Sequence, residues 1–171
     1  TKVPHLIRDA LAYCLDRPVE SIRVAAPDVG GGFGVKMQLF PEEVLVSHAA
    51  ATLRRPVKWV QDRIENLQAS FHARELDVDA RVHATPSGEL IALEAYLASD
   101  TGAYSAFPLT CSLDAQTAGS GLPGPDRWHR YRYRGETYTT NKYPTGAYRG
   151  VGFPVGPLVV GVAHDIVGRY S

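Results

Sequence analysis

Two stretches of alternating residues constrain the fold more than any other feature of the sequence. They occupy residues 75–84 and 90–99, and the apolar positions of the first recur at every second residue, at Leu76, Val78, Ala80 and Val82. Alternation of this kind is typical of antiparallel strands with one buried face. Residues 86–88, Pro-Ser-Gly, have the chemistry of a tight turn. The sequence therefore predicts a long antiparallel hairpin.

Other periodic segments surround this hairpin. Helical spacing and dipole-matched end charges predict helices over 4–16, 41–53 and 155–169. Short apolar or alternating runs predict strands over 20–26, 57–60 and 129–140, and residues 101–126 are rich enough in Gly, Pro, Ser and Thr to predict a long irregular excursion. The expected fold class is α+β, a mixed sheet with an antiparallel hairpin and packed helices.

Composition excludes several classes of function. The 171 residues include 18 basic and 18 acidic side chains, so the overall positive charge of a typical nucleic-acid-binding protein is missing. Cys14 and Cys111 form no Cys-x-x-Cys pair, which argues against a zinc or iron–sulfur site within the chain. No apolar run approaches the ~20 residues of a membrane span. The sequence lacks an initiator Met, and we expect 1–171 to be one part of a larger subunit.

The first candidate site is the glycine-rich loop at 30–36, GGGFGVK, between a predicted strand and a predicted helix. Consecutive glycines let backbone N–H groups approach an anion closely. Val35 and Met37 break the Walker A pattern, and Val35 also breaks the dinucleotide GxGxxG pattern. On the glycines alone, a ligand-binding loop and a ligand-free tight connection are about equally favoured.

A second glycine-rich loop, GAYRGVGFP at 146–154, places Arg149 just before a predicted helix, where its fork of donors suits an oxyanion. Taken alone, an ordinary surface arginine is the simpler interpretation. The segment at 127–134, RWHRYRYR, interleaves basic and aromatic residues as single-stranded nucleic-acid sites do. We favour instead an exposed strand with arginines toward solvent and Tyr131 and Tyr133 packed inward.

Together, the two glycine-rich loops resemble one family. The molybdenum-binding subunits of the xanthine dehydrogenase/aldehyde oxidase family contain a GGxFGxK loop and, later, a GA(F/Y)RGxGxP loop, as found here at 30–36 and 146–154. RRPVKWVQDRIENL at 54–67 and SDTGAYS at 99–105 also match the family pattern. The sequence of residues 57–67 and the pair Met37-Gln38 resemble the carbon monoxide dehydrogenase large-subunit-like branch. Members that oxidise carbon monoxide have a cysteine where Gly150 stands, so that activity is not predicted.

The resemblance implies part of a molybdopterin-binding domain over 1–171, from a molybdenum hydroxylase. Such enzymes oxidise an aldehyde or a heterocyclic carbon with oxygen derived from water, and their molybdopterin is usually the cytosine dinucleotide form in bacteria. FAD and iron–sulfur clusters lie on partner subunits or domains, and the expected parent is a cytoplasmic dimer of heterotrimers. We expect no nucleic-acid partner, no membrane span, and no molybdenum bound to this chain alone.

Carried over position by position, the resemblance assigns cofactor-binding roles to five residues: Gly31, Gly32, Phe33, Gly34 and Arg149. Met37 and Val151 occupy substrate-pocket positions, and both differ from the residues of purine-oxidising members, which argues against xanthine. The catalytic glutamate of the family matches no residue here, so no catalytic residue and no direct metal ligand is assigned. The alternative function is a non-catalytic binding module that uses the strand at 127–134. The relative position of the two loops distinguishes these hypotheses, because an enzyme needs both at one cleft.

Overall fold

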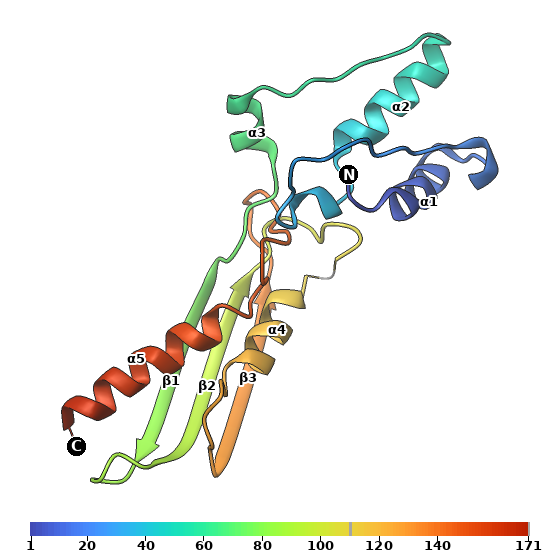
Figure 1. Cartoon of the computed structure of the whole chain (residues 1–171). Coiled ribbons are helices and arrows are strands. Elements are labelled where there is room, and N and C mark those ends of the chain that lie inside the picture. The colour runs from blue at the N-terminus through green and yellow to red at the C-terminus, as the bar shows by residue number, and fades with distance from the viewer. Residues whose placement is uncertain (110, 171) are drawn as a thin grey trace.

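A computed structural model describes residues 1–109 and 111–170 of the chain. A three-stranded sheet forms its elongated lower half, and a helical region lies beyond one end of that sheet (Figure 1). The elements follow one another as α1 (Pro4–Leu15), the 3-10 turns η1 (Val19–Ser21) and η2 (Val35–Met37), α2 (Pro41–Leu53), α3 (Arg63–Ala69), β1 (Leu76–Ala84), β2 (Leu90–Asp100), α4 (Leu113–Gly121), β3 (Arg130–Tyr138) and α5 (Val155–Tyr170).

The predicted hairpin is confirmed. Strands β1 and β2 pair antiparallel, with Val78 opposite Leu97 and a register shift between His83 and Ala84. The turn closes where the N–H of Thr85 donates to the carbonyl of Glu89 at 2.9 Å. Strand β3 joins the other edge of β2 in parallel, so the sheet is mixed and has the order β1-β2-β3. The predicted α+β class is therefore confirmed.

Alternation gives the sheet one apolar and one charged face. Leu93, Ala95 and Leu97 of β2 are buried, and Leu97 packs with Ala115 and Ala118 of α4. Helices α4 and α5 lie on the same side of the sheet (Figure 1). On the opposite face, Glu94 lies between Arg132 of β3 and Arg81 of β1, so opposite charges alternate across the strands.

Three sequence-based predictions are wrong. Residues 20–26 and 57–60 form no strand, because within the described chain neither segment has a neighbouring strand to bond; Val60 is 70% exposed and Trp59 50%. Residues 101–126 are not irregular throughout, since they include α4. Its Ala, Gly, Ser and Thr residues look like loop composition, yet they let the helix pack closely on β2 and β3. No helix in the described residues is long and apolar enough to cross a membrane.

Candidate functional site

The two glycine-rich loops meet directly. The peptide N–H of Arg149 donates to the carbonyl oxygen of Phe33 at 2.7 Å. A Cβ atom on Gly34, whose φ is +110°, would lie 2.5 Å from the carbonyl oxygen of Ala147, so only glycine allows this approach. The prediction that Phe33 and Arg149 converge is confirmed, because their main chains are in direct contact.

The first loop turns back on itself before α2. The N–H of Val35 donates to the carbonyl of Gly32 at 3.0 Å, and that of Met37 to Gly34 at 2.9 Å. Phe33 has a φ of +50°, which is uncommon for a residue with a side chain, and the residue is 62% exposed. Within the described residues, the N–H groups of Gly31–Gly34 donate to no protein acceptor. These four donors are therefore available to a bound anion.

Gln38 joins the first loop to the second. In the sequence it stood out only beside Met37 as part of the family resemblance, without a role in the site. Its side chain is 1% exposed. With the amide oriented to satisfy both ends, its oxygen accepts from the N–H of Ala147 and its nitrogen donates to the carbonyls of Gly34 and Val35. The side chain thus holds the two loops at a fixed separation from inside the protein.

Arg74 supports the second loop by bonding its carbonyl oxygens. The sequence-based prediction of the site did not include this residue. Its Nε donates to the carbonyl oxygen of Val151 at 2.8 Å, and its Nη2 donates to the carbonyl oxygens of Arg149 and Tyr148. The guanidinium carbon lies 4.9 Å from the centre of the Tyr148 ring. Arg74 lies two residues after His72, which forms a parallel bridge with Thr145. An arginine next to a segment that pairs with the loop is therefore the signal that could have identified this residue.

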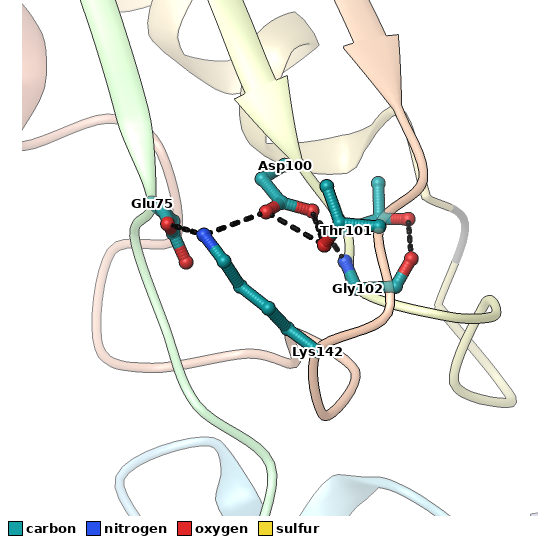
Figure 2. Close-up of polar contacts among 6 residues, drawn as sticks. Glu75, Asp100, Thr101, Gly102 and Lys142 are labelled. Atoms are coloured by element: carbon teal, nitrogen blue, oxygen red, sulfur yellow. Dashed lines mark hydrogen bonds and ion pairs between the residues drawn. The ribbon is translucent and has the colours of Figure 1, made fainter.

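A buried carboxylate fixes the approach to the second loop. Asp100, at the end of β2, is 1% exposed and accepts hydrogen bonds from the Gly102 N–H at 2.8 Å and the Thr140 hydroxyl at 2.9 Å. Lys142 Nζ lies 3.1 Å from the same carboxylate and also pairs with Glu75 (Figure 2). Burial alone would raise the pKa of Asp100, but the Gly102 N–H, Thr140 and Lys142 outweigh it and lower the pKa. The segment that leads to Arg149 is thereby tied to the sheet.

A small cavity of about 20 Å³, room for one water molecule, lies behind the second loop. Its lining includes Val151, Ala147 and Asp114. Val151 has a φ of +53°, strained for a β-branched residue, and such strain clusters at functional sites. Burial raises the pKa of Asp114, and the nearby charge of Arg74 opposes that rise. Met37 does not line this cavity, so the structure does not bring the two predicted substrate positions together there.

The Arg149 side chain is exposed, and within the described chain it has no hydrogen-bond or ion-pair partner. The side-chain donors of this arginine are therefore free, and its main chain contacts the first loop at Phe33. Lys36 is likewise exposed and free of any ion pair with the described residues. The site is positively charged although the chain as a whole is neutral.

The strand at 127–134 gives little support to the alternative function. The hydroxyls of Tyr131 and Tyr133 donate to carbonyls of α4 at 2.7 and 2.6 Å, so both rings face the helix. Arg130, Arg132 and Arg134 are exposed on the other face, as predicted, where Glu94 and Glu136 accompany them. No aromatic platform for bases is formed by this strand.

Comparison with known families agrees with the geometry of the loops. The family model of the molybdopterin cofactor-binding domain matches residues 1–169. This chain belongs to the molybdopterin cofactor-binding domain family. The nicotine 6-hydroxylase large subunit of Paenarthrobacter nicotinovorans is 38% identical to this family member over 159 residues, which cover 92% of the chain and 20% of the relative. The carbon monoxide dehydrogenase large chain of Hydrogenophaga pseudoflava is 37% identical over 106 residues, 62% of the chain and 13% of the relative.

Solved structures show the same fold for this molybdopterin cofactor-binding chain. Quinoline 2-oxidoreductase from Pseudomonas putida 86 superposes with a TM-score of 0.93 and 35% identity, over 97% of this chain and 21% of that one. The chain thus spans about a fifth of the length of nicotine 6-hydroxylase and of quinoline 2-oxidoreductase. Both alternating strands and both glycine-rich loops lie within the matched region.

Proposed function

We propose that the two loops together hold the anionic end of a molybdopterin cofactor in the subunit that contains this chain. The observation that supports this most strongly is the hydrogen bond from the Arg149 N–H to the Phe33 carbonyl, which brings the residue with a free guanidinium into contact with the loop that has free backbone donors. The proposed cofactor-binding residues are Gly31, Gly32, Phe33, Gly34 and Arg149.

The residues present fit such a group. Oxo and phosphate oxygens accept hydrogen bonds only, and the site offers a group of donors: the N–H groups of Gly31–Gly34 and the Arg149 side chain. The exposed Lys36 adds positive charge nearby. When bound, the molybdenum cofactor supplies the redox chemistry, and this chain orients the cofactor and stabilises its negative charge.

In the subunit as a whole, the proposed reaction is oxidation of an aldehyde or a heterocyclic carbon with oxygen derived from water. Two relatives act, by name, on nicotine and quinoline, which are nitrogen heterocycles. We propose that Val151 and Met37 face the substrate path and that purines are not substrates. The finer points of this proposal are a cytosine dinucleotide form of the cofactor, FAD and iron–sulfur partner subunits, a dimer of heterotrimers and a cytoplasmic location.

The test is Arg149→Lys in the full-length subunit, purified with its partners. Lysine keeps the charge but loses the planar fork, so we expect roughly a tenfold loss of activity, equivalent to one charged hydrogen bond, and a lower molybdenum content. Circular dichroism should be unchanged, because the main-chain bond to Phe33 does not involve the side chain. Arg132→Lys, on the exposed face of β3, is the matched control. Wild-type molybdenum content and turnover in Arg149→Lys would overturn the role of Arg149.

A further inference from the structure

Arg74 is the one described side chain that bonds three carbonyls of the second loop. Its guanidinium reaches the carbonyl oxygens of Tyr148, Arg149 and Val151. Residues 71–74 run alongside the start of that loop, because the N–H of Gly146 donates to the carbonyl of His72 at 2.7 Å. Arg74 therefore belongs to a segment that is itself hydrogen-bonded to the second loop.

The backbone that Arg74 contacts is strained. Gly150 has a φ of +91° and Val151 a φ of +53°. The second is costly for a β-branched residue and persists only where the surroundings hold it. The N–H of Val151 donates back to the carbonyl of Tyr148 at 2.6 Å, which closes a tight turn around Arg149. Donors aimed at the carbonyls of this turn stabilise the conformation in which it presents the Arg149 side chain.

The hydrogen bonds of the Arg74 guanidinium all go to carbonyl oxygens, and the group also lies over the Tyr148 ring. Among the described residues, no carboxylate lies within 4.0 Å of its guanidinium, and the adjacent Glu75 pairs with Lys142 instead. Burial raises the pKa of Asp114, and the charge of Arg74 lowers it without a direct ion pair. Without a carboxylate in ion-pair contact, Arg74 adds its positive charge to that of Arg149 and Lys36.

We propose that Arg74 is a positioning residue that holds the Tyr148–Val151 turn so that the Arg149 side chain points to the bound anion. The expected effect on cofactor binding rests on the proposed function. The role of Arg74 in holding the turn does not depend on it. Lysine could not replace Arg74, since one ammonium cannot bond the carbonyls of Arg149 and Val151 in a fork and also cover the Tyr148 ring.

The first experiment measures hydrogen exchange in the full-length subunit with Arg74→Lys. The amides of Arg149 and Val151 are both hydrogen-bonded, so their exchange reports on the turn. We expect exchange across 148–151 to become roughly tenfold faster, as loss of one charged hydrogen bond implies, while the sheet amides keep their wild-type rates. Arg132→Lys is the control and should change neither region. Wild-type exchange across 148–151 would overturn the proposal.

The second experiment asks whether Arg74 acts through Arg149. Molybdenum content is compared in Arg74→Lys, Arg149→Lys and the double variant. We expect the double variant to match Arg149→Lys, because a misplaced turn no longer matters once its functional side chain is gone. Losses that multiply would show independent roles and overturn the proposal. Wild-type content in Arg149→Lys would refute the proposed function, while the exchange measurement would still decide the role of Arg74.

A folding defect is separated from a positioning role by a second variant. Arg74→Gln keeps one side-chain donor and removes the charge. If Arg74→Lys does not fold, exchange across 148–151 is measured in Arg74→Gln with the same expectation. Failure of both variants to fold would assign Arg74 to folding and would contradict the positioning role.

Discussion

The N–H of Arg149 and the carbonyl of Phe33 are joined by a 2.7 Å hydrogen bond, so the two glycine-rich loops are connected main chain to main chain. Neither side chain takes part in that bond. The relative position of the loops therefore survives a substitution at either residue, and such a substitution tests the chemistry of the site separately from its assembly. Residues that set the loop spacing lie elsewhere, at Gly34 and Gln38.

Gly34→Ala should separate the loops. An alanine there adopts a left-handed conformation at a cost of about 1–2 kcal/mol, and its Cβ meets the Ala147 carbonyl at 2.5 Å, which adds to that cost. We expect a loss of at least about 2 kcal/mol in the free energy of unfolding, measured by urea denaturation of the chain. Gly30→Ala is the matched control, because a Cβ at Gly30 meets nothing within 4 Å. Equal stability of the two variants would contradict the close contact.

Gln38→Met tests the buried amide that links both loops. Methionine keeps a similar volume, so packing changes little, but the Ala147 N–H and the Val35 carbonyl lose their partner, while the Gly34 carbonyl keeps the N–H of Met37. Leaving buried polar groups unsatisfied costs about 1–3 kcal/mol, and the melting temperature should fall accordingly. The exposed Gln68, changed in the same way, should have almost no effect. A Gln38→Met protein as stable as wild type would show that the amide is dispensable.

Periodicity correctly predicted the elements with a clear apolar face, namely strands β1 and β2 and helices α1 and α5. Helix α2 buries no residue, and its end charges and Pro41 predicted it instead. The strands expected at 20–26 and 57–60 failed because an apolar run forms a strand only where another strand is available to bond it. Helix α4 was missed because its burial against Leu97 depends on tertiary packing that no local pattern contains.

The loops of the site could be predicted, but their supports could not. GGGFGVK and GAYRGVGFP are contiguous motifs, so their glycines and Arg149 stand out in the sequence. Arg74 and Gln38 act on backbone atoms far along the chain, and backbone acceptors leave no trace in the identity of the residues that carry them. Val151 was selected by family position, yet its left-handed conformation appears only in three dimensions.

Acid should weaken the hydrogen bonds and the ion pair of the Asp100 carboxylate. Its pKa is lower in the folded chain than in the unfolded one, so the folded state binds fewer protons and stability rises with pH across that interval. The contribution is complete above the unfolded value of about 3.9 and is lost as pH falls through the folded value. Asp100→Asn should cost about 1–3 kcal/mol at pH 7, and this difference should shrink at pH 3 in urea unfolding of both proteins. A pH-independent difference would show that the charge of Asp100 contributes nothing.

The chain alone should bind no molybdenum. Its proposed donors lie on an open surface: Phe33 is 62% exposed and Arg149 is exposed. In water, attraction between unit charges at 4 Å amounts to about 1 kcal/mol, which is smaller than the entropy lost when ligand and loops are ordered together. Only a site closed from the other side by further protein would exclude enough water to strengthen these contacts. The measurement is elemental analysis of residues 1–171 after gel filtration, with the full-length subunit purified in parallel as the positive control. Stoichiometric molybdenum on the chain alone would mean that the two loops and Lys36 suffice to hold the cofactor.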